Sequence, residues 1–104
     1  MSRVAIDDTG RWFDSEKAQT FEESKWFDGN NMVSLATRQA NCFQTLYRTA
    51  SGAWVIYSHD YYQGSADTYT IVSDKRAAAW LIVNEHDPKG FDATIRELML
   101  ALEV

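Results

Sequence analysis

The stretch Phe43-Gln-Thr-Leu-Tyr-Arg-Thr49, Ala50-Ser-Gly-Ala53, Trp54-Val-Ile-Tyr-Ser-His59 decides the fold of this chain. Aromatic and β-branched residues alternate with polar ones at a period of two, and Gly52 marks a turn between the two runs. We therefore predict an antiparallel hairpin of strands 43–49 and 53–59. A third strand is predicted over 67–72, after a connection that contains Gly64.

Neither face of this hairpin is purely polar. Phe43, Thr45 and Tyr47 point to one side of the strand. Gln44, Leu46 and Arg48 point to the other. A sheet with apolar residues on both faces needs a cover on both. We expect helices on one face and a partner on the other.

The segments before the hairpin carry weaker signals. We predict a short edge strand over 3–6 and a helix that begins at Asp14 or Ser15 and runs through about Ser24, because both residues are good N-caps. The turn residues at 28–31 lead into a further strand over 32–37, which is expected to form one edge of the sheet or to pair with the N-terminal strand.

The segment after the sheet reads as two helices. Ser73 is the predicted cap of a helix that ends near Asn84, and residues 86–90 form a solvent-facing linker. Asp92 opens a last helix with apolar residues at helical spacing. The predicted fold class is α+β: a single domain over 1–104, with an antiparallel sheet of three to five strands, a short N-terminal helix and two C-terminal helices.

Composition narrows the choice of partners. The chain has 15 Asp and Glu against 10 Lys and Arg, a formal charge of −5, and its basic residues are scattered. Direct nucleic-acid binding is therefore not expected, whereas docking onto a protein with a basic surface is. No apolar run is long enough for a membrane span and no signal peptide is recognisable, so we expect a cytoplasmic location without membrane contact.

No catalytic or metal-binding motif is present. His59-Asp60 and His86-Asp87 invite an acid–base interpretation, but neighbours in one strand point to opposite faces. The single cysteine, Cys42, excludes an internal disulfide and a multi-thiolate metal site. We predict that the protein is not an enzyme and uses no cofactor and no metal.

The segment Tyr57-Ser-His-Asp-Tyr-Tyr-Gln63 is the best candidate for recognition. Tyrosine supplies large, stiff and amphipathic contact area, and tyrosines are enriched at binding hot spots. We expect this segment and the adjoining loop at 63–65 to form the contact surface, with acidic residues at its rim. The predicted partner-binding residues are Tyr57, His59, Asp60, Tyr61, Tyr62, Gln63 and Asp67.

Five short stretches carry a resemblance to known proteins: Arg11-Trp-Phe-Asp-Ser-Glu-Lys-Ala18, Trp26-Phe-Asp-Gly-Asn-Asn31, Leu46–Val55, Tyr62-Gln-Gly-Ser65 and Ala78-Ala-Trp-Leu81. Over roughly 11–87 the chain resembles a group of small, uncharacterised prokaryotic proteins, some of them borne on mobile elements. The resemblance implies no activity. In size and composition alone the chain is also similar to phage-encoded anti-CRISPR proteins, which is an analogy.

Three functions follow as hypotheses. The first is a non-enzymatic protein-binding module that covers a functional surface, in its sharpest form an anti-CRISPR-type inhibitor of a host defence complex. The second is a small ligand-binding or enzymatic domain that uses the aromatic sheet face with His59. The third is a dimeric accessory or antitoxin-like protein, which leaves a homodimer open.

Overall fold

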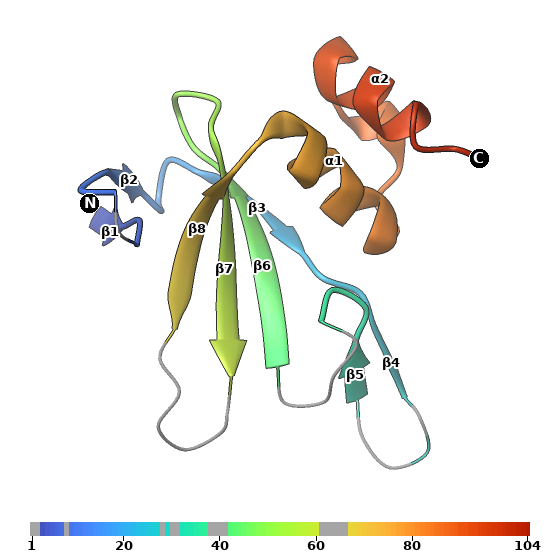
Figure 1. The fold of residues 1–104 in the computed structure, drawn as a ribbon, viewed down its shortest axis with the longest axis horizontal. Helices are drawn as coiled ribbons and strands as arrows, with labels where there is room; N and C mark the ends of the chain where they lie inside the picture. The colour runs from blue at the N-terminus through green and yellow to red at the C-terminus, as the bar shows by residue number, and fades with distance from the viewer. Residues whose placement is uncertain (1–2, 8, 28, 30–31, 38–41, 61–66) are drawn as a thin grey trace.

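A computed structural model describes residues 3–7, 9–27, 29, 32–37, 42–60 and 67–104. In these ranges the chain forms eight strands and two α-helices (Figure 1). The main sheet is antiparallel, with the order β3-β6-β7-β8. Its strands are β3 (Gln19–Glu22), β6 (Cys42–Arg48), β7 (Trp54–Asp60) and β8 (Thr68–Val72).

The predicted hairpin is confirmed. Strands β6 and β7 pair from Cys42 opposite Asp60 to Arg48 opposite Trp54. The turn between them closes where Gly52 donates its N–H to the Thr49 carbonyl at 2.9 Å. Gly52 has φ of 90°, a left-handed conformation that glycine adopts without steric cost.

Two smaller sheets flank the main one. Strands β1 (Arg3–Ala5) and β2 (Trp12–Asp14) form the N-terminal hairpin, and β4 (Lys25–Phe27) pairs with β5 (Met32–Ser34). The prediction of one sheet of three to five strands is therefore wrong in detail, although α+β describes the class. The strand expected over 32–37 joins β4 instead of the main sheet, and it ends at Ser34 because the Ser34 hydroxyl accepts the N–H groups of Ala36 and Thr37.

The predicted N-terminal helix is also wrong. Asp14 does accept the N–H of Glu16 through its side chain, and its carbonyl accepts the N–H of Lys17, but these bonds close a turn. The chain then enters β3, where Thr20 and Phe21 pair with Tyr47 and Leu46 of β6. Pairing with a neighbouring strand outweighs a local capping signal in this segment.

The two C-terminal helices begin at the predicted caps. Helix α1 (Asp74–Val83) follows Ser73, whose side chain accepts the Arg76 N–H at 3.1 Å, and it ends at Asn84. A 3₁₀ turn, η1 (Pro88–Gly90), leads to α2 (Ala93–Leu100), which Asp92 caps. The two C-terminal helices are therefore confirmed. Their first residues could be predicted because a helix cap depends on residues that are close in sequence.

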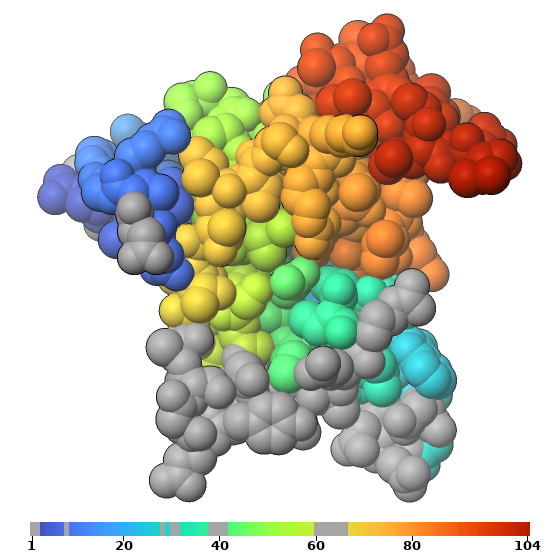
Figure 2. Space-filling model, in the orientation of Figure 1, coloured from blue at the N-terminus to red at the C-terminus, as the bar shows by residue number. Residues whose placement is uncertain are grey.

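Each face of the main sheet has its own cover. Leu46, Trp54 and Ile56 lie in the core under α1 and α2. On the other face, Val55 packs with Ile6 and Phe13 from the N-terminal hairpin. Figure 2 shows the N-terminal hairpin in blue and α2 in red on opposite sides of β8 and α1. The second face is therefore covered in part by the chain itself, where we had expected a partner.

The segment 86–90 is a solvent-facing linker only in part, since Asp87, Lys89 and Gly90 are exposed but His86 is not. His86 is half-buried, and its ring lies 5.8 Å from that of Phe21 and 6.1 Å from that of Trp80, measured between centroids. Its Nε2 atom lies 2.8 Å from the carbonyl oxygen of Glu22 on edge strand β3. His86 thus joins the end of α1 to the sheet edge.

Candidate binding surface on the main sheet

Four side chains meet on the second face of the main sheet, at the end of β7 where β8 begins. Tyr57 and Tyr69 are direct partners in the β7–β8 ladder, so their side chains lie on the same face. His59 follows two residues after Tyr57 and points to that face as well, and Asp67 directly precedes β8. We call Tyr57, His59, Asp67 and Tyr69 the Tyr–His–Asp cluster.

The Asp67 carboxylate connects the side chains of Tyr57 and His59. Its Oδ2 atom accepts a hydrogen bond of 2.9 Å from the Tyr57 hydroxyl, and its Oδ1 atom lies 2.5 Å from His59 Nδ1. The Tyr57 and Tyr69 rings stack with centroids 4.8 Å apart, and the His59 ring stacks on Tyr57 at 6.2 Å. These contacts hold the rings in one arrangement over two strands.

The cluster is accessible to a partner. The His59 side chain is 31% exposed and that of Asp67 is 47% exposed. Tyr57 and Tyr69 are half-buried, because Tyr69 also packs against Phe13 of the N-terminal hairpin with ring centroids 6.2 Å apart. The hairpin therefore supports the cluster on the side of Tyr69.

The electrostatics of the cluster favour an ionised carboxylate and a neutral phenol. Hydrogen bonds from His59 and then from Tyr57 lower the pKa of Asp67. Partial burial, followed by the hydrogen bond to Asp67, raises the pKa of Tyr57 to about 12. The Asp67 contacts contribute fully to stability above the pKa of an aspartate in the unfolded chain, about 3.9. This contribution is lost as the pH falls through the lower pKa that Asp67 has in the folded protein.

A hollow of about 300 Å³ opens beside the cluster, between β3, β4, β6 and β7. Its lining residues are Glu22, Glu23, Lys25, Phe43, Gln44, Thr45, Tyr57 and His59. The Glu23 side chain is only 4% exposed, and its Oε2 atom accepts from the Ser34 hydroxyl at 2.5 Å and from the Gln44 N–H at 2.8 Å. Glu23 is thus a structural carboxylate that holds β5 against β6.

The structure brings together three of the predicted contact residues, Tyr57, His59 and Asp67. Asp60 is the last residue of β7, opposite Cys42 in the ladder. The predictions for Tyr61, Tyr62 and Gln63, and for the loop at 63–65, fall outside the described residues.

The contact prediction missed Tyr69 and the role of Asp67. We had placed Asp67 at the rim as a charge, whereas it is the hydrogen-bonding centre of the cluster. The strand register identifies this contact, since Ser58 pairs with Thr68 and this places His59 beside Asp67. The sequence alone does not give that register, because it leaves the length of the loop open.

The described residues contain no group of three or more His, Cys, Asp or Glu side chains placed to hold a metal ion. Among the helices that the structure describes, none has the length and apolar character needed to cross a membrane. Comparisons with protein-family models, curated proteins and solved structures found no match to this chain.

Proposed function

We propose that the protein is a binding module that recognises a basic segment of a protein partner through the Tyr–His–Asp cluster. The observation that carries this proposal is the position of Asp67, which holds Tyr57 and His59 together on an accessible part of the sheet. Rings that are already fixed lose little conformational entropy when a partner docks.

The chemistry of the cluster suits an arginine better than a lysine. A guanidinium stacks on an aromatic face and donates to a carboxylate at the same time. The formal charge of −5 adds a long-range attraction for basic partners and speeds their approach. A cytoplasmic location belongs to this proposal, and a role as an inhibitor of a host defence complex stays a prediction from size and composition.

The test is a titration followed by NMR with two peptides of equal length. One is rich in arginine, and the other carries citrulline at each arginine position, which keeps the shape and removes the charge. We expect saturable shifts at the amides of Tyr57, His59, Asp67 and Tyr69 with the arginine peptide only. Higher salt should weaken this binding because the contact is partly electrostatic.

A matched pair of variants separates site binding from general attraction. Asp67→Lys and Glu103→Lys change the net charge equally, and Glu103 is exposed next to the C-terminus. We expect Asp67→Lys to weaken binding about tenfold or more and Glu103→Lys to change it less than about twofold. Equal losses in both variants, or shifts spread over all acidic residues, would contradict the proposal.

One observation favours a second function, acid–base catalysis. The Asp67 carboxylate beside His59 Nδ1 is the arrangement that orients an imidazole and supports it as a base. The hollow of about 300 Å³ next to it offers room for a small substrate. A His59→Gln variant that hydrolyses an activated ester as fast as the unchanged protein would rule out this function for that substrate class.

A further inference from the structure

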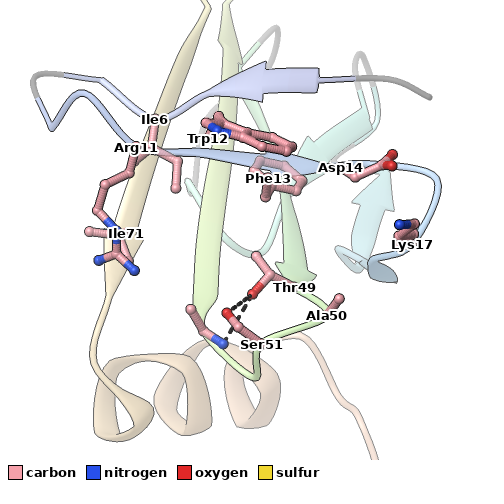
Figure 3. Close-up of a pocket in the computed structure, with 11 residues that line it drawn as sticks. Ile6, Arg11, Trp12, Phe13, Asp14, Lys17, Thr49, Ala50, Ser51 and Ile71 are labelled. Carbon is pink, nitrogen blue, oxygen red and sulfur yellow. Dashed lines mark hydrogen bonds between the residues drawn. The ribbon is translucent and has the colours of Figure 1, made fainter.

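A second hollow lies at the other end of the sheet, away from the Tyr–His–Asp cluster. It measures about 250 Å³ and opens between the N-terminal hairpin and the turn that joins β6 to β7 (Figure 3). In Figure 3, Trp12 and Phe13 extend from β2 on one side, and Thr49 and Ser51 lie on the turn at the other. Two segments that are distant in sequence thus form its walls.

The inner wall of this hollow is apolar. Ile6 and Phe13 are 5% and 4% exposed, so they belong to the packed layer between the hairpin and the sheet. Ile71 of β8 and Ala53 of the turn complete this wall. An apolar wall in a concave site favours a ligand with a hydrophobic body.

The hollow has a cation at each end, with Arg11 beside Ile71 and Lys17 beside Asp14 in Figure 3. Arg11 and Lys17 both line it and are exposed. Within the described ranges neither side chain forms a hydrogen bond or an ion pair, although acidic residues outnumber basic ones in the chain by 15 to 10. The carboxylate that also lines the hollow, Asp14, accepts the Glu16 N–H at 3.0 Å. Asp14 keeps its negative charge and lies beside Lys17, so Arg11 is the lining cation that is available to an anion.

A pair of hydroxyl groups adds a polar contact. Thr49 Oγ1 lies 3.0 Å from Ser51 Oγ and accepts the Ala53 N–H at 3.1 Å. When the Thr49 hydroxyl donates to Ser51, the Ser51 hydroxyl proton is free to point toward a ligand. Ser51 is exposed, so this donor is reachable from the mouth.

We propose that this hollow binds a small carboxylic acid with an aromatic or branched aliphatic body. The body lies against Ile6, Phe13 and Ile71, and the carboxylate lies beside Arg11, which Figure 3 shows next to Ile71. A volume of about 250 Å³ is below the usual range for drug-sized ligands, which limits the ligand to a single small ring system or a short branched chain. The inference does not depend on the proposed protein-binding function.

Three acids serve as probes: indole-3-acetate, phenylacetate and isovalerate. Each is titrated by NMR beside its uncharged amide, which has the same shape. For at least one acid we expect saturable shifts at the amides of Ser51, Gly52 and Ala53, with a dissociation constant of about 1 mM or tighter. The matching amide should bind about fivefold to tenfold more weakly because it lacks the charge.

Variants identify the cation. Arg11→Gln should weaken binding of the acid about threefold to tenfold and leave binding of the amide unchanged, whereas Lys17→Gln should weaken binding of the acid less than about twofold. Lys75→Gln removes an exposed charge on α1 and should change neither. Thermal unfolding of each variant shows that the fold is kept.

Three results would overturn the proposal. The first is the absence of saturable binding for all three acids at concentrations up to about tenfold above the expected dissociation constant. The second is equal affinity for an acid and its amide. The third is an equal effect of Arg11→Gln and Lys75→Gln on binding of the acid. The Tyr–His–Asp cluster is not part of these measurements, so their failure leaves the proposed protein-binding function standing.

Discussion

Asn84 should contribute more to stability than any other polar side chain at the junction of α1 and the sheet. It is 3% exposed and makes hydrogen bonds in two directions. Its Oδ1 atom accepts the Ser24 N–H at 3.0 Å, and its Nδ2 atom donates to the Trp80 carbonyl at 2.8 Å. The side chain thus connects the helix end to the segment between β3 and β4.

Replacing Asn84 with alanine removes both bonds. The Ser24 N–H loses its acceptor, which costs about 1–3 kcal/mol for a part-buried donor. The Trp80 carbonyl still accepts the backbone N–H of residue 84 at 3.0 Å, so the second loss is smaller, about 1 kcal/mol. We expect Asn84→Ala to lower the free energy of unfolding by about 2–4 kcal/mol, or Tm by roughly 10–30 °C for a domain of this size.

Urea unfolding followed by circular dichroism measures this loss. Ser24→Ala is the control, because it removes only the bond of 2.8 Å from the Ser24 hydroxyl to the Asn84 carbonyl and should cost about 1 kcal/mol. Asn84→Asp keeps the shape but places an acceptor against the Trp80 carbonyl. The loss of stability in Asn84→Asp should become smaller as the pH falls, because the protonated carboxyl can donate a hydrogen bond to the Trp80 carbonyl. If Asn84→Ala costs no more than Ser24→Ala, the Asn84 side chain does not stabilise this junction through its two hydrogen bonds.

Three further predictions concern the helix end, the core and the cluster. Glu85 follows α1 with φ of 65°, so Glu85→Gly should raise the free energy of unfolding by about 0.5–1 kcal/mol. Glu85→Ala removes the same charge and should not raise the free energy of unfolding. Equal free energies of unfolding for the two variants would argue against backbone strain at this residue. Among the residues that the structure describes, Trp54 Nε1 is buried and has no hydrogen-bond partner, whereas Trp80 Nε1 donates to a side-chain amide at 3.0 Å. Chemical denaturation should therefore show Trp80→Phe to be more costly than Trp54→Phe by about 1–2 kcal/mol. The pKa of Tyr57, raised from 10.0 to about 12, should fall part of the way back in Asp67→Asn, as measured by tyrosinate absorbance. Because the raised pKa belongs to the folded state, the contribution of Tyr57 to stability should be complete below about pH 10 and lost as the pH rises to about 12, and an unchanged titration in Asp67→Asn would contradict the hydrogen bond.

Part of the candidate site could be predicted from composition and alternation. Tyr57 and His59 share a face because side chains alternate along a strand, and that much follows from the sequence. The partner of His59 does not follow from the sequence, because neighbours in a strand alternate between faces and the partner must come from another strand. Only the β7–β8 register places Asp67 beside the imidazole.

The hairpin of β6 and β7 and the caps at Ser73 and Asp92 were determined by the sequence alone. They rest on contacts between residues close in sequence, namely strand alternation, a glycine turn and side-chain caps. The segment after Asp14 was decided by the tertiary structure. A local cap is worth about 1 kcal/mol, whereas β3 gains four ladder pairs with β6 and packs Phe21 against the helical core. The larger gain comes from residues that are distant in sequence, and no local pattern shows them.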